Sequence, residues 1–145
     1  MGDISKDINS KFPNERTKAL INIKFTANWL NTVGNEFLNP FKITNQQYNI
    51  LRILKGANDA VTVNTVKERM IEKSPNATRL MDKLCDKGLL ERTRCENDRR
   101  VVYVKISEKG INLLDKIKVD ELGKAMNTIS EEEAKILNVI LDKIR

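Results

Sequence analysis

Cationic side chains are the residues best suited to do chemistry in this sequence of 145 residues. With no histidine and two cysteines, the chain lacks the usual general base and too few ligands remain for a structural zinc site. Its acidic residues form no recognisable catalytic motif. Lysine and arginine outnumber aspartate and glutamate by eleven to seven between Thr62 and Lys105. This local positive charge favours a polyanionic partner over an enzymatic reaction, and predicts neither a cofactor nor a metal.

A short polar face in this basic region has the residue types that read DNA bases. At 100° per residue, Asn76, Arg79 and Lys83 fall opposite an apolar stripe, on a helix narrow enough for the major groove. Arg79 suits two parallel hydrogen bonds to guanine, and Asn76 suits an adenine edge. Ser74 and the helix start suit a phosphate, and Thr78 a phosphate or a thymine methyl group. The alternative is a solvated helix surface whose charges pair with one another.

The segments around this helix carry start and stop signals. Ser74 followed by Pro75 predicts the N-cap and the first helical position, and Gly88 predicts the end of the helix. Thr62 predicts the cap of a short preceding helix. Two short helices joined by a tight turn match a helix-turn-helix.

Two further helices are predicted before this motif. The first spans about 14–38 and ends before Pro40. It carries two apolar stripes where a surface helix needs one, which predicts packing on both sides. The second begins with a capping box formed by Thr44 and Gln47 and is stopped by Gly56.

The apolar period changes from about 3.6 to 2 after Gly88. Residues 90–94 and 100–106 therefore predict two strands, joined by a polar hairpin tip at 95–99.

Two helices are predicted to close the chain. Ser107 caps a long helix whose apolar residues run to Ile129. Ser130 and Glu133 form a second capping box, which opens the last helix.

The order of these elements, together with three motifs, resembles the MarR family (multiple antibiotic resistance regulators). The motifs lie at 74–84, 87–92 and 97–110. The most specific feature is the Asp-x-Arg of Asp98 and Arg100, followed at a fixed distance by a strand and Ser-Glu-Lys-Gly. The resemblance implies a mainly α fold: a winged helix-turn-helix with a two-stranded β-wing and N- and C-terminal dimerisation helices.

The resemblance also implies how the chain is divided. Residues 1–145 are expected to form a single domain. Within it, residues 44–107 form the DNA-binding lobe, and residues 1–38 with 108–145 form the dimerisation lobe.

The wing supplies the second group of candidate DNA contacts. By resemblance, Arg100 enters the minor groove while Asp98 orients its guanidinium, and Arg99 contacts a phosphate or shares the task. Arg92 and Arg94 lie on one side of the preceding strand and are candidate phosphate contacts. The alternative is that the wing arginines only keep an exposed hairpin soluble.

The family dimerises through its terminal helices. Here the apolar faces of 111–129 and 136–144, with Ile4, Ile8 and Phe12, supply the material for such an interface. Two-fold symmetry then requires a pseudo-palindromic DNA site with half-sites about one turn apart. The alternative is an intramolecular helical core.

Relatives in this family often release DNA when a small phenolic or aromatic compound lodges between the two lobes. By resemblance, Phe25, Trp29 and Tyr48 are the candidate ligand contacts, although aromatic residues at helical spacing are also typical of plain core. Cys85 is expected to be buried, and Cys95 to be an exposed thiol. A peroxide-sensing branch of the family uses a cysteine near the start of its first helix, where this chain has none.

The sequence therefore predicts a homodimeric transcriptional regulator that binds specific sites in double-stranded DNA. It is expected to be a repressor that leaves its DNA site when a small aromatic effector binds. No apolar run is long enough for a membrane helix, and the first six residues lack the pattern of a signal peptide, so a cytoplasmic location is expected. The alternative function is a winged-helix module that binds a protein partner without specific DNA readout. An enzyme using the fold only to dimerise would need a cofactor motif, and none is recognisable.

Overall fold

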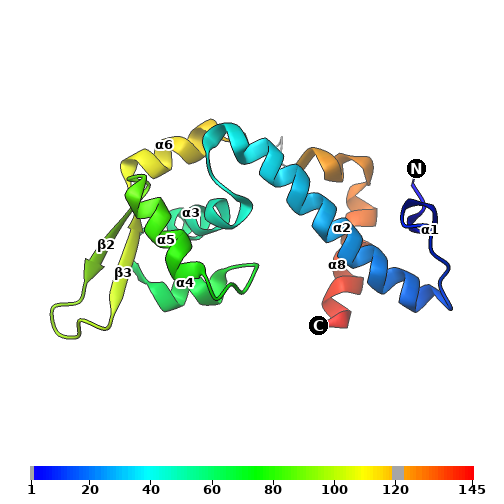
Figure 1. Cartoon of the computed structure of the whole chain (residues 1–145), viewed down its shortest axis with the longest axis horizontal. Helices are drawn as coiled ribbons and strands as arrows, with labels where there is room; N and C mark the ends of the chain where they lie inside the picture. Colours follow the sequence, from blue (N-terminus) through cyan, green and yellow to red (C-terminus); the bar gives the residue numbers. More distant parts are fainter. Residues whose placement is uncertain (1, 119–122) are drawn as a thin grey trace.

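The computed structural model describes residues 2–118 and 123–145. A long helix, α2 (Glu15–Leu38), connects the two ends of an elongated molecule (Figure 1). The short helix α1 (Ile4–Asp7) and the terminal helix α8 (Glu131–Ile144) lie toward one end, and the helices and strands of residues 39–116 gather at the other. The predicted mainly α fold is confirmed.

Two elements follow α2, the short 3₁₀ turn η1 (Asn39–Phe41) and the helix α3 (Asn45–Ala57). The helix-turn-helix comes next and consists of α4 (Val63–Arg69) and α5 (Ala77–Asp86).

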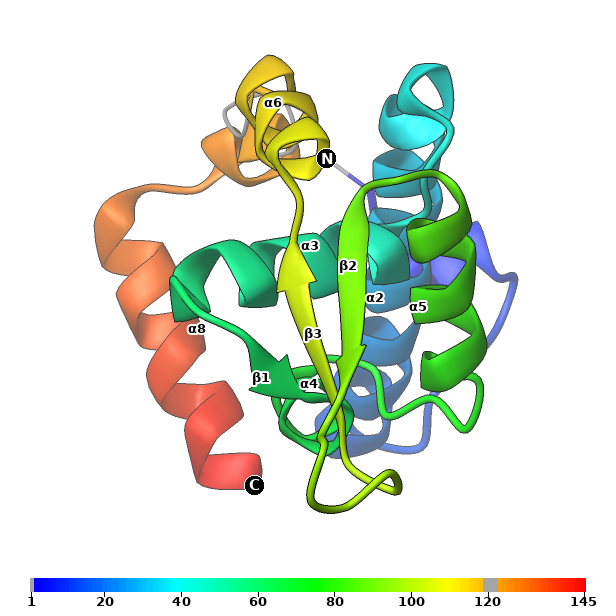
Figure 2. The same ribbon diagram turned by 90° about the vertical axis from the view of Figure 1, so that its left-hand side faces the viewer.

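The wing is an antiparallel pair of strands, as predicted. β2 (Leu90–Arg94) pairs with β3 (Val102–Ile106), with Leu90 opposite Ile106 and Arg94 opposite Val102. A third strand, β1 (Val61–Thr62), pairs with the other edge of β3. Figure 2 shows this sheet with α3 behind it and α5 beside β2. β1 was not predicted, because two residues are too few to show an alternating pattern.

Local capping rules place most helix starts correctly. Thr44 and Ser130 form capping boxes with Gln47 and Glu133, and the Thr62 hydroxyl accepts the backbone N–H of Thr65 at the start of α4. After the wing, the Ser107 hydroxyl likewise caps α6 (Glu108–Lys116).

Gly88 ends α5 in the left-handed conformation, at φ +71°. Its N–H donates to the Cys85 carbonyl at 2.8 Å, and the Leu89 N–H donates to the Leu84 carbonyl at 2.9 Å. This pair of bonds is the Schellman motif that a glycine at this position favours.

Two of the predicted boundaries around the helix-turn-helix are wrong. The Ser74 hydroxyl accepts the N–H of Asn76, two residues on, and the first helical bond runs from Leu80 to Asn76, so α5 starts at Ala77 and Ser74 is not its N-cap. Gly56 does not stop α3, because Asn58 takes the left-handed cap position at φ 58°.

The predicted long helix between Ser107 and Ile129 is also wrong in the described residues. α6 ends at Lys116, where Ile117 turns to an extended conformation and buries its side chain in the core. A short 3₁₀ turn, η2 (Lys124–Thr128), precedes α8. Leu122, one of the apolar residues assigned to this helix, lies outside the described residues.

The core lies between α3, α5 and the sheet. Leu51 and Leu54 of α3, Leu84 of α5 and Val104 of β3 are at most 1% exposed. Because this core fixes α5 against α3 and β3, it also fixes the direction in which the opposite face of α5 points.

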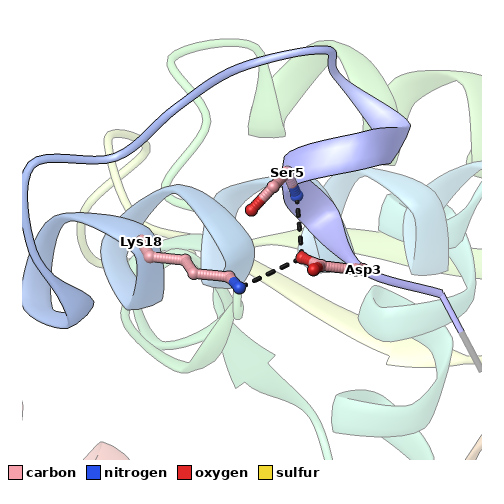
Figure 3. A network of polar contacts seen from close by, with 3 residues as sticks. All are labelled: Asp3, Ser5 and Lys18. Atoms are coloured by element: carbon pink, nitrogen blue, oxygen red, sulfur yellow. Dashed lines mark hydrogen bonds and ion pairs between the residues drawn. The ribbon is translucent and has the colours of Figure 1, made fainter.

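The N-terminus docks on α2 through a small polar network (Figure 3). The Asp3 carboxylate accepts the N–H of Ser5 and pairs with the Lys18 ammonium, each at 3.0 Å. The hydrogen bond from Ser5 and the ammonium of Lys18 lower the pKa of Asp3 to about 2.

In the part of the chain that the structure describes, no helix combines the length and hydropathy that a bilayer crossing requires.

Candidate nucleic-acid interface

The exposed side of α5 carries the three residues predicted to read bases, called here the reading face: Asn76, Arg79 and Lys83. All three are exposed, while Ala77 and Met81 on the opposite side are buried. Within residues 2–118 and 123–145, the Arg79 guanidinium has no hydrogen bond or ion pair. It is therefore available for a partner outside the chain.

The alternative interpretation is that charged residues on the surface of α5 pair with one another. The structure shows other partners for them. Asp82 forms an ion pair with Arg92 of β2, and Lys87 donates to the Lys42 carbonyl of the turn before α3. These two interactions connect α5 to β2 and to the turn before α3, and neither of them involves Arg79.

The helix α5 and the wing are joined at the base of the wing. The Ser107 hydroxyl donates to the Gly88 carbonyl at 2.6 Å, and the Ser107 N–H donates to the Leu89 carbonyl at 3.1 Å. Together with the ion pair of Asp82 and Arg92, these bonds hold the strands against α5. The reading face and the base of the wing are therefore held in one arrangement.

The tip of the wing is shaped by Asp98. Its carboxylate accepts the N–H of Arg100 at 3.0 Å, and its carbonyl accepts the N–H of Val101 at 3.0 Å. An aspartate commonly bonds the N–H two residues on, so Asp98 shapes the backbone of the turn. In the described residues no ion pair joins Asp98 to the Arg100 guanidinium, and the role of Asp98 in orienting that side chain stays a prediction.

Three arginines of the wing, Arg94, Arg99 and Arg100, have exposed side chains.

The two cysteines are both half-buried. Cys85 packs against the core, as expected in part, whereas Cys95 is less exposed than predicted.

A cleft of about 330 Å³, called here the wing cleft, separates α5 from the wing and α4. From the predicted set it brings together Thr78, Arg92 and Arg100. It also includes Asn64 and Lys67 of α4, which the sequence reasoning missed. These two residues could have been predicted, because the first helix of a helix-turn-helix crosses the DNA backbone and its exposed polar residues are candidate phosphate contacts.

A second hollow of about 510 Å³ lies between α2 and α3. Tyr48 lines it together with Leu30, Val33 and the strongly exposed Ile71. Phe25 and Trp29 do not line this cavity. They are 41% and 48% exposed on α2, so the structure does not bring the three predicted ligand residues together.

Residues 33–117, which contain the whole helix-turn-helix and wing, match the family model described as the transcriptional regulator SarA/Rot. The chain belongs to the SarA/Rot family of transcriptional regulators. Among its curated relatives, the HTH-type transcriptional regulator FarR of Neisseria gonorrhoeae is 30% identical over 129 residues, covering 86% of this chain and 88% of FarR. The HTH-type transcriptional regulator MhqR of Bacillus subtilis is 28% identical over 118 residues, covering 79% and 81%.

Solved structures extend the likeness of this SarA/Rot regulator to the MarR fold. A mutant MarR of E. coli in complex with operator DNA is 25% identical, with a TM-score of 0.72 and 99% of each chain covered. The organohalide-sensing regulator RdhR in its 2,4-dichlorophenol-bound form has a TM-score of 0.80 at 21% identity, covering 93% of this chain and 85% of RdhR. The predicted resemblance to MarR regulators is confirmed.

Proposed function

We propose that this SarA/Rot regulator is a homodimeric repressor that reads specific DNA sites through Asn76, Arg79 and Lys83. The observation that carries the proposal is the unpaired, exposed Arg79, held on a rigid helix beside the wing cleft. A planar guanidinium in the major groove discriminates guanine from the other bases. Ser74 lies in the turn before this helix and Thr78 lies in its first turn, where phosphate contacts would position the helix on DNA.

The wing supplies the second contact of each protomer. In this proposal Arg100 enters the minor groove, and Arg94 and Arg99 meet phosphates; the exposure of all three side chains supports these roles. Arg92 is shared between Asp82 and the wing cleft, so it contributes to DNA binding mainly by adding charge near the backbone.

Exposed apolar side chains on α2 and α8 support the homodimer. Leu20 of α2 is 53% exposed, and Ile136 and Val139 of α8 are 60% and 63% exposed. No residue of α8 is buried. Apolar surface of this extent on two long helices is typical of a face covered by a second copy. We therefore assign 1–38 and 108–145 to dimerisation and 44–107 to DNA binding.

Selection of duplexes from a random pool by the purified chain tests the DNA-binding proposal. We expect enrichment of a pseudo-palindromic site with half-sites about one helical turn apart, bound with steep salt dependence. A reporter promoter carrying that site should be silenced by the chain. Equal binding of all duplexes would contradict the proposal that the protein recognises a specific DNA sequence. No binding at low salt would instead favour a module for a protein partner.

The hollow beside Tyr48 supports release by a small aromatic effector, and we propose that site for it. 2,4-Dichlorophenol is expected to lower the affinity of the dimer for its selected site. Ile71→Asp, which places a charge at the rim of the hollow, should weaken this effect by about fivefold, as expected from the loss of roughly 1 kcal/mol of apolar contact. Anisotropy of a labelled duplex during titration with the phenol measures both effects.

The matched control for this test is Ile136→Asp on α8, an exposed isoleucine that does not line the hollow. It should impair dimerisation and leave the phenol response of the DNA-bound fraction unchanged. An unchanged phenol response in Ile71→Asp would place the effector elsewhere.

A further inference from the structure

A second groove lies on the side of α5 that faces away from the wing cleft. It measures about 740 Å³ and lies between α5, the turn η1, the end of α2 and the start of α3. We call it the elbow groove; its cationic residues are Lys42, Lys83 and Lys87. At 100° per residue, Lys83 lies 140° around α5 from Thr78 of the wing cleft, with Arg79 between them. The reading face is therefore bordered by a cationic hollow on each side.

The charges of the elbow groove are available to an anion. All three lysines are exposed, and within the described ranges the ammonium groups of Lys42 and Lys83 have no hydrogen-bond or ion-pair partner. Lys87 donates to the carbonyl of Lys42, which holds η1 against the end of α5.

One carboxylate, Glu72, also borders the groove. It accepts hydrogen bonds from Asn31 at 3.1 Å and from Gln46 at 2.6 Å, so both of its oxygens are already engaged. The other polar groups of the lining are mainly carboxamides, such as Asn35 and Asn39, which can donate to oxygen. The groove keeps an excess of positive charge and of donors.

We propose that the elbow groove seats phosphates of the DNA backbone that runs along the flank of the major groove opposite the wing cleft. The inference rests on the proposed DNA-binding function and extends it to a surface that also includes η1, the end of α2 and the start of α3. A helix about 10–12 Å wide in a major groove about 12 Å wide has one phosphate backbone along each flank. The open shape of the groove and its continuity with the reading face through Lys83 favour DNA over a small free anion.

Lys42→Asn tests this inference, because asparagine removes the charge and tolerates the left-handed backbone that Lys42 adopts at φ 57°. Each lost phosphate contact lowers the slope of log K against log salt by about 0.9, or by about 1.8 for the two grooves of a dimer. At 0.15 M salt this corresponds to about fivefold weaker binding per groove. The preference for the selected site over a scrambled duplex should not change, and Lys42→Arg should keep the wild-type slope.

Lys135→Asn on α8 is the control, since it removes the same charge from an exposed position outside the groove. If Lys42→Asn lowers the melting temperature, Lys42→Gly is measured in its place, because glycine suits the same backbone. A wild-type chain that binds DNA and a Lys42→Asn chain with an unchanged slope would overturn the inference and leave the proposed function standing. The inference would equally fail if inorganic phosphate bound the free chain through Lys42 while the DNA slope stayed unchanged.

Discussion

Replacing Arg79 with alanine is expected to remove most of the preference of the dimer for its selected site. A bidentate contact with guanine provides about 1–3 kcal/mol of discrimination, which corresponds to roughly 5- to 150-fold for each half-site. Because Arg79 is exposed and makes no hydrogen bond or ion pair within the described residues, its removal should leave the fold unchanged. The loss therefore reports on DNA reading and not on stability.

The measurement is the ratio of affinities for the selected duplex and for a scrambled duplex of equal length. Arg100→Ala should lower both affinities by similar factors, because a narrow minor groove attracts an arginine largely by its potential. Arg16→Ala, at an exposed position near the start of α2, is the control and should change neither. If Arg79→Ala weakens both duplexes equally, Arg79 contacts phosphate, and the assignment of the reading face is wrong.

The second large effect concerns the fold at the base of the wing. A Cβ atom on Gly110 would lie 2.3 Å from the Leu89 carbonyl oxygen and 2.8 Å from Cγ1 of Ile106. That carbonyl also accepts the N–H of Ser107, so it cannot withdraw without losing a buried hydrogen bond. Gly110→Ala should therefore lower the free energy of unfolding by about 2–3 kcal/mol, in the range of an overpacked core.

Gly56→Ala is the matched control for Gly110→Ala, because no atom lies within 4 Å of the Cβ it would add. Inside α3 that exchange should stabilise the chain by about 0.4–1 kcal/mol, since alanine has fewer unfolded conformations than glycine. Urea denaturation at one fixed chain concentration compares the two variants. Equal stabilities of the two variants would show that α6 can shift away from Leu89 at little cost.

Most of the fold follows from rules that act within a few residues. The capping boxes at Thr44 and Ser130, the cap at Ser107 and the left-handed Gly88 are local, and the structure has all of them. Two local predictions failed as well, the N-cap at Ser74 and the helix stop at Gly56. The predicted long helix after Ser107 failed because of a distant contact. A helical pattern continues past Lys116 in the sequence, but the core takes the side chain of Ile117 and the helix ends there.

The candidate site was predictable in its residue types and less so in its contacts. The outward position of Arg79 follows from helical periodicity alone. The partner of Arg92 is Asp82, ten residues earlier, and that of Lys87 is the carbonyl of Lys42, 45 residues earlier. Sequence patterns of one helix or one hairpin contain no information about such pairs. The same reason explains why the elbow groove was missed, because its walls come from four separate elements.

The hydrogen bonds at Gly88, Leu89 and Ser107 have a consequence for the proposed release of DNA. Because they join the hairpin to α5, a displacement of this lobe relative to α2 would rotate both elements as one body. If the proposed effector bound near Tyr48 and caused such a rotation, Arg79 and Arg100 would leave their grooves together. Both contacts of a half-site should then be lost in the same step.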